Sequence, residues 1–169
     1  METSFQEFLR QKTEGSDWKD RGQRRREWLD ALNRLFDQIR AWIREVDPEG
    51  LLELVSYEVE RVEDRLGVYD APAMKIRLDL DFVDIRPVGR FAIGTLLLRQ
   101  LQALAANAQR CGDLSGGRVD MTNGERRYIL LRSITDGQDC WYALAGDVGG
   151  VPTPFDANCL QAILRNLLG

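Results

Sequence analysis

Apolar residues recur at steps of three and four along the N-terminal third of the chain, which is the spacing of one face of a helix. They predict a long amphipathic helix from about residue 17 to 46, with Ser16 or Asp17 able to cap its start. The apolar positions are Trp28, Leu29, Leu32, Leu35, Phe36, Ile39, Trp42, Ile43 and Val46. A shorter helix over about 4–13 comes first, because Ser4-Phe5-Gln6-Glu7 matches a capping box.

The next segment, from Leu51 to Leu66, fits two patterns. Its apolar residues match helical spacing, but they also alternate with polar ones around Tyr57. Gly50 suits a first helical turn badly and the β-branched residues favour a strand, so we expect a strand. Strict alternation from Met74 to Leu80 predicts another strand. The apolar residues then change from even to odd positions, at Val83 and Ile85. This change indicates a hairpin turn or bulge near 79–82.

The C-terminal half combines helical and strand patterns. A helix is expected over 95–111, followed by strands at 118–121, 128–134 and 140–144, a loop at 146–154 and a final helix capped by Asp156. Asn123-Gly124 and Asp136-Gly137 are hairpin signals. The prediction is therefore an α+β domain with an antiparallel sheet of about five or six strands. A long N-terminal helix, a middle helix and a C-terminal helix pack on it. We expect a single domain over 1–169, with a helical segment at 1–46 and a mixed body at 51–169.

The amino-acid composition excludes several classes of catalytic and metal-binding site. The chain has 169 residues, a formal net charge of −4 and no histidine. Histidine-based nucleophilic catalysis, histidine general bases and histidine metal ligands are thereby excluded. Cys111, Cys140 and Cys159 are scattered, so a zinc site lacks its usual ligands and free thiols in a reducing cytoplasm are expected. The N-terminus lacks the basic and apolar regions of a signal peptide, and no cofactor or membrane association is expected.

One group of acidic residues offers a catalytic alternative. Asp79, Asp81 and Asp84 fall at the predicted strand turn, with Asp70 upstream. Carboxylates crowded at a turn can hold Mg²⁺. With Arg86, the arrangement is loosely similar to the acidic pair and basic residue of restriction-type nucleases, although that family has lysine where this chain has arginine. The resemblance implies a Mg²⁺-dependent nuclease or another phosphate-processing enzyme.

A group of basic residues offers a second alternative. It lies near the start of the long helix and consists of Lys19, Arg21, Arg24, Arg25 and Arg26. Clustered arginines can bind phosphates, so accessory nucleic-acid binding is one interpretation. The stretch 49–64 has six acids and one arginine, a net of −5. Opposite charges on one chain favour self-association or internal packing equally well.

The leading hypothesis from the sequence is a non-enzymatic interaction or regulatory protein. The long helix carries tryptophan on its apolar stripe, and such residues dominate binding energy where they are exposed at an interface. The expected interaction residues are Trp28, Leu32, Leu35, Ile39 and Trp42. The expected partner is another protein or a second copy of the chain, with a homodimer through residues 17–46.

Overall fold

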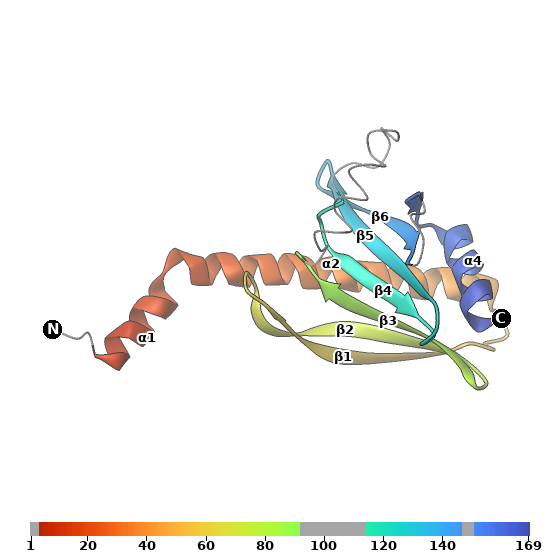
Figure 1. Ribbon diagram of the computed structural model, residues 1–169, viewed down its shortest axis with the longest axis horizontal. Coiled ribbons are helices and arrows are strands. Elements are labelled where there is room, and N and C mark those ends of the chain that lie inside the picture. Colours follow the sequence, from red (N-terminus) through yellow and green to blue (C-terminus); the bar gives the residue numbers. More distant parts are fainter. Residues whose placement is uncertain (1–3, 92–113, 147–150) are drawn as a thin grey trace.

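The computed structural model describes residues 4–91, 114–146 and 151–169, apart from the side chains of residues 16–18. The described helices are α1 (Phe5–Glu14), α2 (Ser16–Val46) and α4 (Ala157–Leu168). The described strands are β1 (Glu53–Glu63), β2 (Gly67–Leu78), β3 (Asp81–Gly89), β4 (Arg118–Thr122), β5 (Arg127–Thr135), β6 (Gln138–Ala145) and β7 (Thr153–Pro154). Figure 1 shows α2 running across the sheet, with α4 near the C-terminal end of α2.

The strands form one antiparallel sheet in the order of the sequence, from β1 to β7. Short turns join most neighbours, as in any meander. Asp136 and Gly137 both have positive φ, 51° and 74°, as the tight turn between β5 and β6 requires. Asn123 holds the turn between β4 and β5 by accepting hydrogen bonds from the backbone N–H groups of Glu125 and Arg126, at 3.0 and 2.8 Å.

The main core lies between α2, α4 and one face of the sheet. Neighbouring strands place apolar side chains opposite each other, as in the pairs Met74–Ile85 and Ile76–Val83. The buried sheet residues that join α2 in this core include Met74, Ile76, Val83, Ile85, Val119, Met121, Leu130 and Ala143. A smaller cluster contains Ile129 and Leu131 of β5, Leu144 of β6, and Leu114 from the segment before β4. Because side chains alternate along a strand, the three strand residues lie on the other face of the sheet.

The fold class predicted from the sequence is confirmed, because helices pack on one antiparallel sheet. The sheet has seven strands in the described residues, against the expected five or six. The ambiguous segment forms β1, as expected, and β7 lies within a predicted loop. The predicted helix at 95–111 falls outside the described residues.

The helix ends agree only in part with the sequence-based prediction. The Ser4 hydroxyl accepts a hydrogen bond from the Glu7 amide at 3.2 Å, which confirms the N-terminal half of the predicted capping box. α2 begins at Ser16, close to the predicted start, but its N-cap is Gly15 and not Ser16 or Asp17. Glycine is still suitable as an N-cap residue, since it costs the helix little stability at that position. At the other end, Asp47 accepts the backbone N–H groups of Leu51 and Leu52 at 2.9 and 2.8 Å, which fixes the connection to β1.

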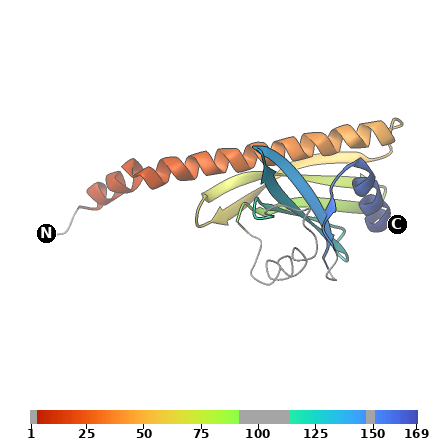
Figure 2. The same ribbon diagram turned by 90° about the horizontal axis from the view of Figure 1, so that it is seen from above.

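The N-terminal helices extend away from the rest of the molecule. With 31 residues, α2 is about 46 Å long at ~1.5 Å per residue. From residue 19 onward, the first buried residue of α2 is Trp28. Figure 2 shows α1 and the beginning of α2 lying beyond the end of the sheet. We call residues 5–26 the arm.

Candidate interaction surfaces

The predicted interaction stripe on α2 is covered within the chain. Trp28, Leu32, Leu35 and Ile39 are at most 4% exposed and pack against the sheet. Trp42 is half-buried, and its ring meets the edge of the Phe155 ring at a centroid distance of 5.5 Å. Trp28, Leu32, Leu35 and Ile39 therefore belong to the core of one chain, and Trp42 packs at its edge.

The apolar side chains of the arm are the ones that stay uncovered. In α1, no residue is buried. Phe5 is 73% exposed, and it stacks with Phe8 at a centroid distance of 6.1 Å. Leu9 completes the same helical face at the i+4 position. Exposed apolar stripes on an ordered helix are typical of surfaces that contact another molecule.

The predicted basic cluster lies on the same arm. Lys19, Arg24 and Arg26 are exposed, and Arg21 and Arg25 are half-buried. None of these five side chains forms an ion pair with another residue that the structure describes. The buried Nε of Arg25 has no hydrogen-bond partner there either. The arm therefore combines exposed apolar residues with five basic side chains that have no ion-pair partner in the described part of the chain.

An acidic and apolar surface lies on the outer part of the β1–β2 hairpin. Glu60 pairs with Asp70 across the two strands, and Val62 pairs with Val68 one step further. Residues two apart share a face of the sheet, so these four side chains form one surface. Val62 and Val68 are 69% and 58% exposed. Within the described residues, neither Glu60 nor Asp70 has an ion-pair partner.

A buried arginine joins the base of the arm to the sheet. Arg132 on β5 is 2% exposed, and its guanidinium donates to Asp139 at 2.6 and 2.8 Å and to the Gly116 carbonyl at 3.1 Å. It also donates to Glu27, just after the arm. Arg34 of α2 binds the other oxygen of Asp139 at 2.7 Å. The network holds α2 against β5 and β6.

Sequence reasoning missed this network. A single charged residue inside the apolar run from Tyr128 to Ile134 was the available signal, since a buried arginine requires anionic partners. Burial raises the pKa of Asp139, but hydrogen bonds from Arg34 and Arg132 outweigh this effect, and the pKa lies below its usual value. Asp139 is therefore held as the anion that both arginines need.

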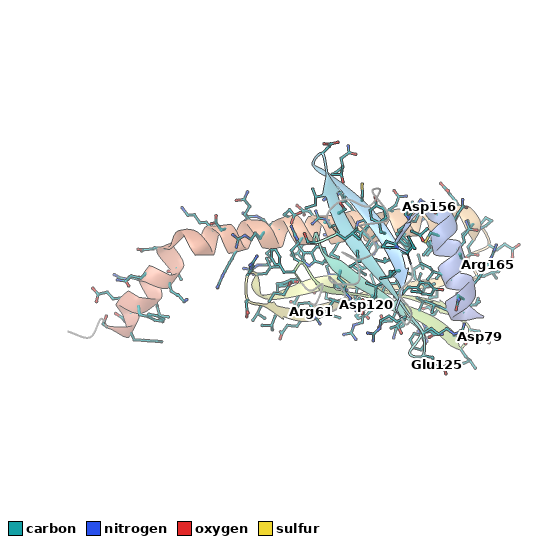
Figure 3. The ribbon with its side chains drawn as sticks, turned by 45° about the horizontal axis from the view of Figure 1, so that its top comes forward. Arg61, Asp79, Asp120, Glu125, Asp156 and Arg165 are labelled. Atoms are coloured by element: carbon teal, nitrogen blue, oxygen red, sulfur yellow. The ribbon has the colours of Figure 1, made fainter. Side chains whose placement is uncertain are left out.

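The acidic alternative is only partly assembled. Asp79, Asp81 and Asp84 line a cavity of about 630 Å³ at the β2–β3 hairpin, together with Lys75, Arg77 and Arg86. Asp79 sits at the turn itself with a φ of 53°, at the end of the sheet where α4 packs (Figure 3). Asp81 and Asp84 are three apart on β3, so their side chains leave opposite faces.

The remaining contacts of these carboxylates are internal. Asp84 accepts a hydrogen bond from the Tyr57 hydroxyl, and burial together with this bond raises the pKa of Tyr57. Asp70 lies opposite Glu60, eight residues along β2 from the strand end at Leu78. Among the described residues, no group of three histidine, cysteine or acidic side chains is placed to hold a metal ion.

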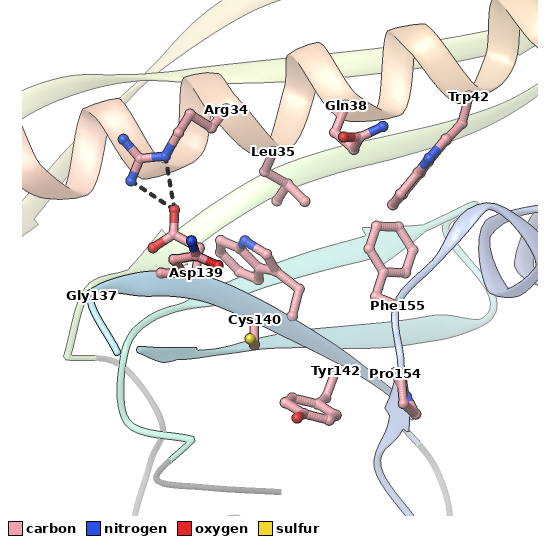
Figure 4. A pocket seen from close by; sticks show the side chains of 12 residues that line it. Arg34, Leu35, Gln38, Trp42, Gly137, Asp139, Cys140, Tyr142, Pro154 and Phe155 are labelled. Carbon is pink, nitrogen blue, oxygen red and sulfur yellow. Dashed lines mark hydrogen bonds and ion pairs between the residues drawn. The ribbon is translucent and has the colours of Figure 1, made fainter. Parts of the chain in front are cut away.

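A second cavity, of about 660 Å³, lies between α2 and the outer edge of β6 (Figure 4). One end is polar, where Arg34 and Asp139 form their ion pair. The other end is aromatic, where Trp42 faces Phe155. Neither composition nor spacing pointed to this groove, because its two walls are far apart in the sequence.

No protein-family model, no curated protein and no solved structure matches this chain. None of the helices that the structure describes is both long and apolar enough to cross a membrane. The uncovered arm and the acidic hairpin surface are the features from which a function is argued below.

Proposed function

We propose that the protein is a non-enzymatic interaction protein that self-associates through its N-terminal arm. The observation that carries this proposal is the stripe of Phe5, Phe8 and Leu9, which is exposed on an ordered helix. Covering such side chains stabilises a complex by roughly 25 cal/mol for each Å² of apolar surface removed from water. The partner in this complex is a second copy of the chain.

Charge supports a second copy as the partner. In the described part of the chain, the cations of the arm and the acids of the β1–β2 hairpin have no ion-pair partner, and both surfaces expose apolar residues. The arm of one copy therefore matches the hairpin surface of another in both charge and polarity. An interface in which each copy supplies both surfaces would be closed and two-fold symmetric.

The direct test is the molar mass in solution, measured by light scattering or sedimentation over a range of protein concentrations. We expect wild-type protein to dimerise and Phe8→Glu to be monomeric, with an unchanged circular dichroism spectrum because Phe8 is exposed. Asn33→Glu introduces the same charge at an exposed site on the body of α2 and serves as the matched control. A wild-type protein that stays monomeric at high concentration contradicts the proposal.

Charge reversal identifies the pairing surfaces. Lys19→Glu with Arg24→Glu should prevent self-association, and so should Glu60→Lys with Asp70→Lys. Mixing the two double variants should restore a heterodimer, because opposite charges then face each other again. If the mixture stays monomeric while wild-type protein dimerises, the dimer uses other surfaces.

A second candidate function, accessory nucleic-acid binding, is favoured by the cations of the arm, for which the described residues provide no ion-pair partner. Phosphate contacts of this kind weaken steeply with salt. The test is fluorescence anisotropy with labelled single- and double-stranded DNA at low and moderate salt. Binding that is lost with Lys19→Glu and Arg24→Glu but retained in Phe8→Glu would support this function over self-association.

A further inference from the structure

A phenylalanine just after the end of β3 has two arginines over its ring. The guanidinium carbon of Arg65 lies 5.0 Å from the centroid of the Phe91 ring, and that of Arg90 lies 4.8 Å from it. Cations at such distances are attracted by the π electrons of the ring. Phe91 is nevertheless 40% exposed, so part of its ring is open to a ligand. An accessible ring and two cations are therefore held at one point of the surface.

Hydrogen bonds from neighbouring elements fix this cluster. The Phe91 amide donates to Oε1 of Glu63, at the end of β1, over 3.1 Å. Arg90 donates from Nη1 to the Ser115 carbonyl at 2.8 Å and from Nε to Glu27 of α2 at 3.4 Å. A site that is already ordered needs little reorganisation to meet a ligand, which lowers the cost of binding.

Hydrogen-bond donors remain available beside the ring. Within the described residues, the guanidinium of Arg65 forms no hydrogen bond or ion pair, and Nη2 of Arg90 has no acceptor. Arg65 is exposed on the turn between β1 and β2, next to the fully buried Leu66. Guanidinium groups with free N–H donors bind phosphate oxygens well, because their planar geometry matches a phosphate group.

The cluster adjoins the basic residues of the arm. Figure 1 shows the β1–β2 turn and the end of β3 beside α2. Glu27, which accepts from Arg90, lies three residues after Arg24, and residues three apart lie on the same side of a helix. Arg24 therefore lies on the side of α2 that meets Arg90. The whole chain has a net charge of −4, whereas residues 19–26 have five bases and one acid.

We propose that Phe91, Arg65 and Arg90 bind an unpaired nucleotide of a single-stranded nucleic acid, whose neighbouring phosphates lie against the arm. The inference rests on the second candidate function and names its ligand. Unpaired bases stack on aromatic rings and guanidinium planes, and every base can do so because each has a π face. The exposed Arg65 can then turn from the ring to a phosphate oxygen. A base inside a duplex cannot reach a ring on the protein surface, so the cluster distinguishes single strands from duplexes.

The probes are a fluorescently labelled oligothymidylate of about 12 nucleotides and its duplex with oligoadenylate. Their binding to the full-length protein is followed by anisotropy at the same low salt concentration. We expect the single strand to bind at least about tenfold more tightly, because only its bases can stack on the protein. No binding of either probe would overturn the nucleic-acid function and this inference together. Equal binding of the two probes would retain that function and overturn the inference alone.

Substitutions of the ring test its role. Phe91→Leu keeps an apolar side chain without a ring, and it should weaken single-strand binding about tenfold and duplex binding less than about twofold. Phe91→Trp keeps a ring and should bind as tightly as the wild type. Phe82→Leu is the matched control, because Phe82 is 37% exposed and has the Lys75 ammonium 5.3 Å from its ring centroid. Equal effects of Phe91→Leu and Phe82→Leu would refute the assignment of the ring.

Substitution of an arginine tests the phosphate contact. Arg65→Ala removes the guanidinium that has no other described partner, and it should weaken single-strand binding about fivefold. Arg86→Ala is the matched control, since the Arg86 side chain is 53% exposed on β3 and lies outside the cluster. The control should change binding less than about twofold. Equal losses in the two variants would show that net charge alone holds the strand and would overturn the role of the cluster.

Discussion

The Trp28 ring packs directly on the backbone of Gly117, so closely that a Cβ atom at residue 117 would lie 2.2 Å from Cζ3 of the ring. Gly117 also has a φ of +143°, which L side chains rarely adopt. On its other side, the Trp28 indole donates a hydrogen bond to the Tyr69 hydroxyl at 3.2 Å. The tryptophan therefore joins the end of the arm to both halves of the sheet.

Gly117→Ala should lower the free energy of unfolding by about 3 kcal/mol, because the methyl group overlaps a buried ring and the backbone is strained. Chemical denaturation followed by circular dichroism measures this loss. Gly22→Ala is the control, since a Cβ there meets no atom within 4 Å and alanine favours the helix. That variant should gain about 0.5–1 kcal/mol. Equal stability of the two variants would show that Trp28 does not pack on residue 117.

Arg132→Leu and Arg34→Leu remove two different donors from the same carboxylate, Asp139. Arg132 is buried, so its loss leaves acidic partners uncompensated and should cost about 3 kcal/mol of stability. Arg34 is mostly exposed, and its loss should cost less than about 1 kcal/mol. Thermal and urea unfolding compare the two, and similar losses would contradict the role of burial.

Asp139 should also contribute to the pH dependence of stability. Its pKa is lowered in the folded protein, from a usual value of 3.8. A lowered pKa stabilises the fold above the unfolded value, and this contribution is lost as the pH falls through the folded value. The stability difference between wild-type protein and Asp139→Asn should therefore be largest at neutral pH and shrink below pH 3.8. Urea unfolding across this range measures it, and a constant difference would argue against the shift.

Mg²⁺ should not bind measurably at the β2–β3 hairpin. Asp81 and Asp84 leave opposite faces of β3, and Asp84 already accepts the Tyr57 hydroxyl. Isothermal titration of wild-type protein and Asp84→Ala should give the same flat trace, with no metal-dependent cleavage of DNA or RNA. A saturable signal in wild-type protein that Asp84→Ala removes would establish the nuclease alternative instead.

The sequence predicted the fold where the signal is local. Alternation and β-branching identified β1, and the parity shift after Leu80 located the β2–β3 turn, which the pairing of Ile76 with Val83 confirms. The two-residue strand β7 was missed because it contains Pro154 and exists only through its pairing with β6. Its formation depends on tertiary contacts that no local pattern encodes.

The candidate surfaces were harder to predict for the same reason. The sequence pattern of an amphipathic stripe is the same whether a sheet or a second molecule covers it. From the sequence, Trp28 and Leu32 therefore fitted the core of one chain and an interface equally well. The basic residues of the cluster lie on the arm, and the absence of ion-pair partners for them among the described residues depends on where the hairpin acids lie. Glu27 and Asp139 could not be assigned to Arg132, because Glu27 is 105 residues away along the chain.

The continuity of α2 has a mechanical consequence. The same helix carries the basic cluster around Arg24 and the groove wall around Gln38, about 21 Å further along. A second copy held by the arm would therefore be kept at a constant separation and angle from the groove beside β6. Inserting one residue between the two regions would rotate one relative to the other by about 100°. The arm could then bind a second copy normally while the geometry of the assembly changed.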